Sequence, residues 1–193
     1  MRKQPQVTEQ TRANLRQAFW ALYAERPVER ISVREITDRA GYNRATFYLY
    51  YHDVYELLEE IEGTVLGNIE RLVQERLLKG DTLEFSQHMG LILRLAQRSR
   101  DYTRVLLGPH GDPAFSDRLK RIISPLVDRF FLPGDETDAR TRAIVREFYL
   151  SGILAIIRIW TADDDPMPID QLIQIVLRIA QGAPAAGPAP DAR

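Results

Sequence analysis

Apolar residues recur every three or four positions along most of the chain, which is the spacing of one buried face of an α-helix. Gly- and Pro-containing stretches interrupt this pattern at 108–113, 132–136 and 163–168. We therefore predict an all-α protein of about nine helices. The predicted helices cover 8–26, 33–40, a short segment after Asn43, 53–79, 82–99, 101–107, 113–131 with Pro125 inside it, 137–161 and 168–181.

Two short helices near the N-terminus carry strong local end signals. Ser32 followed by Glu35 is a capping box at the start of the first, and Gly41 is suited to ending it, since glycine adopts positive φ without steric cost. Asn43 is a good N-cap for the second. Two short helices joined by a tight glycine-containing turn predict a helix-turn-helix unit, whose second helix enters the major groove of DNA.

The second short helix is crowded with aromatic residues, in the sequence TFYLYY at 46–51. By propensity alone this stretch favours a strand. On a helix, Phe47 and Tyr51 lie four residues apart and share one face, which we expect to be buried. Tyr48 and Tyr50 then remain outside, where a phenol packs its ring on the protein and directs its hydroxyl at a phosphate.

The stretch ISVREITDRAGYNRATFYLYYHDVYELLEEI resembles the DNA-binding signature of the tetracycline-repressor (TetR) family of bacterial transcription regulators. The resemblance spans about 45 residues with the first helix, and the matching positions are Gly41, Asn43, Thr46, Phe47, Tyr48, Tyr50 and Leu57. It implies a homodimer with a helix-turn-helix domain at 1–52 and a helical effector-binding and dimerisation domain at 53–182, in which 53–79 is the linking helix. It also implies operator DNA as partner and, by family default, a repressor released by a small-molecule effector.

Candidate DNA contacts follow from the helix-turn-helix reading and from the resemblance. Arg44 and Ala45 begin the recognition helix and so reach base edges, where arginine prefers guanine and alanine meets a thymine methyl group. Val54 stands where the family often has a lysine that supports a phosphate contact. The full predicted set is Arg34, Asn43, Arg44, Ala45, Thr46, Tyr48, Leu49 and Tyr50.

The C-terminal part offers candidates for two further surfaces. Aromatic and polar residues on apolar patterns are candidates for an effector cavity, although each is also typical of an ordinary core: Phe85, His88, Met89, Tyr102, Phe115, Phe148 and Tyr149. The apolar stripe of the last two helices is a candidate dimer interface: Ile153, Ile156, Ile157, Trp160, Leu172, Ile175, Val176 and Ile179. The Ala-, Pro- and Gly-rich tail at 183–193 has a composition typical of disorder.

Composition narrows the class of function. Residues 1–51 hold nine Lys/Arg against five Asp/Glu, whereas the remainder holds 17 against 22, so a basic head precedes an acidic body. A basic head suits contact with phosphates. The chain has no cysteine and three separated histidines, and we find no phosphate loop, dinucleotide fingerprint or catalytic spacing. We expect no enzyme activity, cofactor or metal site.

Three classes of function remain open at this point. The first is a ligand-responsive DNA-binding regulator, the second a small helical enzyme, and the third a helical ligand-binding or adaptor protein that has lost DNA binding. Neither a secretory pattern nor an apolar run of membrane-spanning length occurs, so we expect a cytoplasmic protein without a membrane partner.

Overall fold

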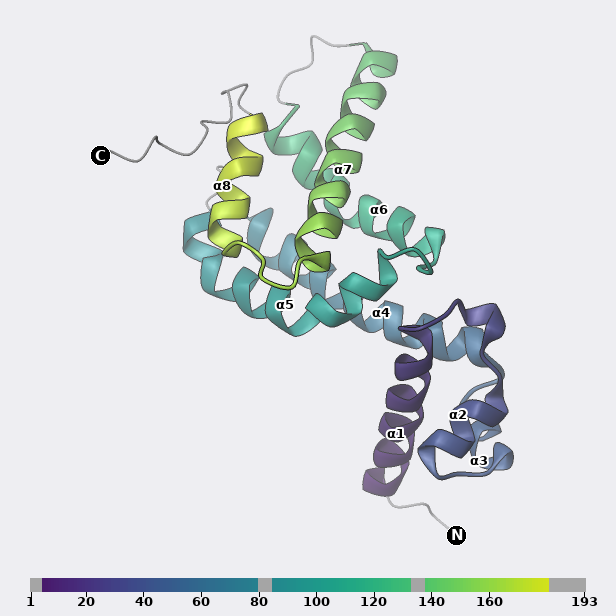
Figure 1. The fold of residues 1–193 in the computed structure, drawn as a ribbon. Coiled ribbons are helices and arrows are strands. Elements are labelled where there is room, and N and C mark those ends of the chain that lie inside the picture. Colours follow the sequence, from purple (N-terminus) through teal and green to yellow (C-terminus); the bar gives the residue numbers. More distant parts are fainter. Residues whose placement is uncertain (1–4, 80–84, 133–137, 181–193) are drawn as a thin grey trace, which may run out of the picture.

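The computed structural model describes residues 5–79, 85–132 and 138–180, of which 5–6, 85–93 and 180 are described by backbone alone. The described part is all-α, as predicted, with eight α-helices (Figure 1). The tail at 183–193, predicted to be disordered, lies outside the described residues. Within the described ranges, no helix combines the length and apolar character needed to cross a membrane.

The helices follow one another along the chain with short connections. They are α1 (Pro5–Tyr23), α2 (Val33–Ala40), α3 (Arg44–Tyr48), α4 (Val54–Leu72), α5 (Phe85–Leu106), α6 (Pro113–Phe130), α7 (Ala139–Ala162) and α8 (Ile169–Ala180). A 3₁₀ turn η1 (Val28–Arg30) precedes α2, and a π-helical turn η2 (Val73–Leu77) extends α4.

Two helices predicted at 82–99 and 101–107 are a single helix, α5. The sequence between them, Ser-Arg-Asp-Tyr at 99–102, contains neither glycine nor proline, so nothing in the backbone ends the helix there. The hydroxyl of Thr103 donates to the backbone oxygen of Ser99 at 2.8 Å, inside the helix. The predicted proline within α6 is confirmed at Pro125.

The N-terminal head consists of α1, α2, α3 and the first turns of α4 (Figure 1). Phe19, Ile36, Phe47 and Leu57, one from each helix, are completely buried in a common core. Burial of such side chains stabilises by about 1.5–3 kcal/mol each. Because α4 supplies one wall of this core, its N-terminal half is fixed to the head.

The body packs around the remainder of α4. Helix α4 contacts α5 and α6, and α7 lies against α5 and α6, while α8 contacts α5. In Figure 1, α4 is the element that passes from the head into the body. Two polar contacts join the parts at this passage: the Tyr23 hydroxyl donates to the backbone oxygen of His110 at 3.1 Å, and Arg118 of α6 pairs with Glu62 of α4.

Candidate nucleic-acid interface

Helix α2 begins with the predicted capping box. The Glu35 backbone N–H donates to the Ser32 hydroxyl oxygen at 3.3 Å, and the Ser32 N–H donates to the Glu35 carboxylate at 3.0 Å. Arg26 pairs with the same carboxylate at 2.6 Å. The hydrogen bonds from the Ser32 side chain and backbone, with that from Arg26, lower the pKa of Glu35 to about 2. The start of α2 is therefore fixed by local sequence and tied to the end of α1.

The turn between α2 and α3 has a defined shape. Gly41 has φ 75° and ψ 30°, a left-handed conformation that favours glycine. The Tyr42 N–H then donates to the backbone oxygen of Thr37 at 2.9 Å. The Tyr42 hydroxyl accepts from Asn14 of α1 at 3.0 Å, and no local sequence signal predicts this contact between residues 28 positions apart. This bond joins the turn to α1.

Helix α3 is short and depends on its cap. Asn43 accepts from the Thr46 N–H at 2.8 Å and from the Thr46 hydroxyl at 3.0 Å. Phe47 is fully buried and Tyr51 is 3% exposed, so the predicted core role of these two rings is confirmed. The Phe47 ring lies edge-on to the ring of Tyr48, with centroids 5.6 Å apart. The buried ring thus supports the exposed one.

The outer face of α3 is open to solvent. Tyr48 is 58% and Leu49 62% exposed, and Arg44 and Ala45 are exposed as well. Thr46 and Tyr50, in contrast, are half-buried. The side chains of Asn43 and Thr46 are engaged in the cap of the helix, and their place among the DNA contacts stays a prediction.

Two positions on the neighbouring helices α2 and α4, Arg34 and Val54, have different surroundings. Arg34 projects from α2 with 72% of its side chain exposed and meets Asp38 at 3.5 Å, an exposed pair of small energetic value. Val54 is buried at the start of α4, where the Asp53 carboxylate caps the helix by accepting from the N–H groups of Tyr55 and Glu56 at 2.9 Å each. Val54, which stands where the TetR family often has a lysine, is therefore part of the core.

Some arginines of the head form ion pairs within the protein, whereas others remain available to contact DNA. Glu60 of α4 accepts from Arg12 and from Arg16, the latter at 2.7 Å, and from the Tyr51 hydroxyl at 3.3 Å. Burial alone would raise the pKa of Glu60, but the hydrogen bonds from the two arginines outweigh it and lower the pKa. Arg44 has no ion pair within the described residues. It is therefore available at the exposed face.

Four of the predicted effector residues have side chains that the structure describes, and these four lie in different surroundings. Phe115 is fully buried in the core, and Tyr102 packs against Trp20 with ring centroids 4.5 Å apart. Phe148 is 70% exposed, and Tyr149 lies against Phe131. Phe85, His88 and Met89, also predicted for the effector site, are described by backbone alone.

A cavity of about 230 Å³ lies elsewhere in the body, lined by apolar side chains of α4, η2, α6, α7 and α8. Five of the residues predicted for the dimer interface line it: Ile153, Ile156, Ile157, Leu172 and Val176. Of the other three, Trp160 donates its indole N–H to the backbone oxygen of Met167 at 2.7 Å, Ile175 is half-buried and Ile179 is 49% exposed. The predicted stripe is thus divided between an inner and an outer surface.

A different apolar stripe of α7 faces outward. Ile144, Phe148 and Ile159 are 64%, 70% and 69% exposed. At about 100° per residue, these three lie within about 40° of a single line along the helix, whereas Ile153 and Ile157 fall on the opposite side. Both sides of α7 are apolar, so helical spacing alone does not decide which of them forms an interface, and the predicted stripe stays a prediction.

Comparison with known proteins identifies the family. Residues 15–61 match the family described as "Bacterial regulatory proteins, tetR family", and residues 84–182, half of the chain, match "Transcriptional regulator C-terminal region" of the same family. The chain belongs to the TetR family of bacterial transcriptional regulators. The resemblance expected from the helix-turn-helix motif is confirmed, and so is the class of function, a DNA-binding regulator.

Individual TetR-family relatives are distant. The uncharacterized HTH-type transcriptional regulator YxbF of Bacillus subtilis (strain 168) is 25% identical over 81 residues, which cover 42% of this chain and about a fifth (21%) of that protein. The TetR transcriptional regulator from Streptococcus agalactiae 2603V has a similar fold, with TM-score 0.68, 19% identity and coverage of 91% of this chain and 96% of that one. The dihydroxyacetone kinase operon activator DhaS has TM-score 0.53 and 18% identity, with coverage of 91% and 98%.

Proposed function

We propose that this protein binds operator DNA as a homodimer, with α3 of each protomer in the major groove, and that an apolar effector changes its affinity for DNA. The observation that carries the proposal is the division of α3 into a buried side and an exposed side. Phe47 and Tyr51 fix the helix to the head, while Arg44, Ala45, Tyr48 and Leu49 remain accessible.

Each exposed side chain of α3 has a role that its chemistry supports. Arg44 and Ala45, in the first turn, read base edges, since the N-terminal residues of a recognition helix reach the groove floor. Tyr48 donates its hydroxyl to a phosphate, which fixes the position of the protein without reading sequence. Arg34, at the exposed side of α2, adds a phosphate contact once the weak pair with Asp38 opens.

Dimerisation through the outer stripe of α7 would bring two such heads together. A contiguous exposed apolar stripe is costly in a monomer and is typical of an interface. Ile144, Phe148 and Ile159 are exposed apolar residues on one side of α7, and we propose that they form the interface together with Ile179, which is exposed on α8. This assignment keeps the two helices predicted for the interface but moves the contact to their outer sides.

The apolar cavity between α4, α6, α7 and α8 is the proposed effector site. Its lining contains only apolar side chains, so an ionised ligand would lose its hydration without gaining a partner. We therefore propose an uncharged, apolar effector. Repression relieved by the effector is the proposed sign of regulation, although DhaS, with the same fold, is by its title an activator.

The proposal is tested with DNA from upstream of the gene and of its neighbours, by fluorescence anisotropy at a fixed salt concentration. Arg44→Ala should lower the affinity for specific DNA by about 1–3 kcal/mol and relax sequence preference at one position of each half-site. Arg121→Ala, a change at an exposed position of α6, is the matched control. Equal binding by both variants, or no specific binding by the unmodified protein, would favour a ligand-binding protein that has lost its DNA contacts.

A further inference from the structure

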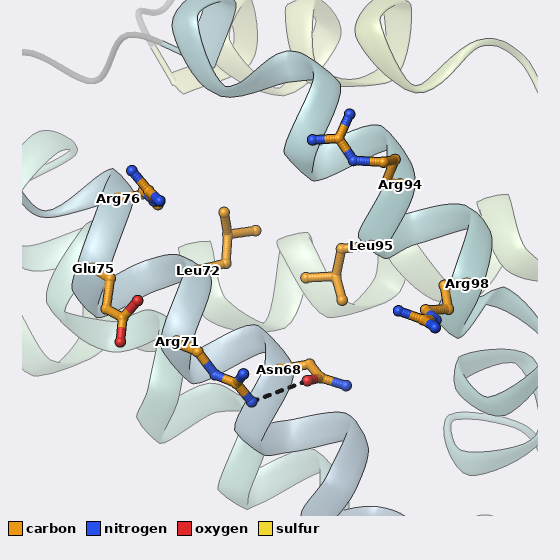
Figure 2. A pocket seen from close by; sticks show the side chains of 8 residues that line it. All are labelled: Asn68, Arg71, Leu72, Glu75, Arg76, Arg94, Leu95 and Arg98. Atoms are coloured by element: carbon orange, nitrogen blue, oxygen red, sulfur yellow. Dashed lines mark hydrogen bonds between the residues drawn. The ribbon is translucent and has the colours of Figure 1, made fainter.

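Four arginines line a groove between the end of α4 and the middle of α5. Arg71 comes from α4, Arg76 from η2, and Arg94 and Arg98 from α5. The groove has a volume of about 330 Å³, at the lower end of the range of small-molecule sites. Figure 2 shows Leu72 and Leu95 facing each other between the two helices, with the arginines placed around them.

These four positive charges form no ion pair within the described residues. None of the guanidinium groups pairs with a described carboxylate, and Arg71 makes one neutral hydrogen bond, to Asn68 at 3.2 Å. Glu75 is the one acidic residue of the lining, so the lining has three more positive than negative side chains. Four like charges around one hollow repel each other, so an anion placed between them would be stabilised.

The positive charge of the groove contrasts with the net negative charge of the body. Residues 52–193 hold 17 Lys/Arg against 22 Asp/Glu, so this groove is a positive site on an acidic body. On α6, in contrast, Arg118 and Lys120 are paired, with Glu62 and Glu147 respectively. The groove differs from these sites because four arginines without an ion pair in the described part of the chain line one hollow.

We propose that this groove binds a small organic phosphate, with the phosphate held by the guanidinium groups and an apolar part resting on Leu72 and Leu95. Guanidinium is planar and presents two parallel N–H donors, a geometry that matches phosphate oxygens. The mixed lining distinguishes this site from the apolar effector cavity. The inference stands apart from the proposed DNA binding and does not depend on it.

The position of the groove favours a small ligand over the DNA backbone. Arg71 lies 17 residues beyond Val54, where α4 begins. At a rise of about 1.5 Å per residue, the groove is roughly 25 Å along the helix from its start beside α3. A hollow between two helices of the body also admits a compact ligand more readily than a duplex.

The test uses calorimetry on the full chain with three probes: phenyl phosphate, inorganic phosphate and phenol. We expect phenyl phosphate to bind most tightly, inorganic phosphate more weakly and phenol not at all. The double change Arg94→Gln and Arg98→Gln should weaken phenyl phosphate binding by at least about tenfold, since hydrogen bonds to charged groups contribute about 1.5–3 kcal/mol each. Arg121→Gln, at an exposed position of α6 outside the groove, should leave it unchanged.

Three results would overturn the proposal. The first is no heat with phenyl phosphate, the second an equal loss in the Arg121→Gln control, and the third binding of phenol as tight as that of phenyl phosphate. Both changed residues are exposed, and circular dichroism checks that each variant is folded. If the double variant loses DNA affinity while the unmodified protein fails to bind phenyl phosphate, the arginines serve the DNA backbone instead.

Discussion

Replacing Glu62 with glutamine should change how the stability of the protein depends on pH. Glu62 lies on α4 with 1% of its side chain exposed, and it pairs with Arg118 of α6. One of its carboxylate oxygens, Oε1, is buried without a hydrogen-bond partner. Burial raises the pKa of Glu62 to about 7 from 4.5, and it outweighs the opposing effect of Arg118.

The sign and size of the effect follow from this pKa. Between pH 4.5 and about 7 the folded chain retains a proton on Glu62 that the unfolded chain has released. The folded state therefore binds more protons, and the free energy of unfolding falls as the pH rises through this window. A shift of this size corresponds to about 3 kcal/mol at 1.36 kcal/mol per pKa unit. Glu62→Gln removes the titrating group, so the free energy of unfolding of the variant should not fall in this way as the pH rises.

Urea denaturation at pH 5 and pH 8 measures the free energy of unfolding of the variant and of the unmodified protein. Trp20 and Trp160 are the fluorescent reporters, and the protomer concentration is the same throughout. The variant should gain about 2.5 kcal/mol relative to the unmodified protein between the two pH values. Glu70→Gln, an exposed change on the same helix eight residues from Glu62, is the control for removal of a charge. The groups around Glu62 are Arg118, Asp112, Glu59 and Tyr23. If the unmodified protein instead gains stability relative to the variant as pH rises, the ion pair dominates and the reasoning fails.

Three further changes separate core, DNA-contact and interface roles. Phe47→Ala should destabilise the head by about 3–5 kcal/mol in urea denaturation, because it empties a fully buried site; a loss below about 1 kcal/mol would contradict this. Tyr48→Phe should leave the urea midpoint unchanged and weaken binding to operator and non-operator DNA alike in anisotropy titrations, so unchanged binding rules out a phosphate contact. Ile159→Asp should give a folded monomer in sedimentation, whereas Ile157→Asp, on the cavity side, should destabilise the body; a dimeric Ile159→Asp variant would place the interface elsewhere.

The head was predictable because its signals act over a few residues. Ser32 caps α2 through Glu35, three positions away, and Asn43 caps α3 through Thr46. Such side chain–backbone bonds need no knowledge of the rest of the fold. The burial of Phe47 and Tyr51 followed from helical spacing as soon as the short helix was recognised.

The sites of the body were less accessible to this reasoning because they join distant parts of the chain. Glu62 and Arg118 are 56 residues apart, and nothing local indicates that the two meet. Helix α7 carries isoleucines on both its cavity side and its exposed side, so periodicity identifies two apolar stripes without ranking them. The arginine groove requires α4 and α5 to lie side by side, a tertiary contact that no single helix encodes.

Helix α4 connects all of these features. The pairs of Glu60 with Arg12 and Arg16 hold it to α1, and the pair of Glu62 with Arg118 holds it to α6. Further along, Leu72 lines the apolar cavity. Val54 and Glu62 are eight residues apart, so a tilt of about 10° at Glu62 moves the start of α4 by about 2 Å. The head, being fixed to α4, moves with it.

We propose that such a tilt controls DNA binding. Two recognition helices in a dimer must lie about 34–36 Å apart to enter successive major grooves. A ligand in the cavity then needs only about 1–3 kcal/mol of differential affinity between the two positions of the head. Linkage requires operator DNA to weaken ligand binding by the same factor. We expect calorimetry with an apolar ligand, found by thermal-shift screening, to give about a 5- to 150-fold lower affinity when operator DNA is saturating. Equal affinities with and without DNA would mean that the cavity is not coupled to the head through α4.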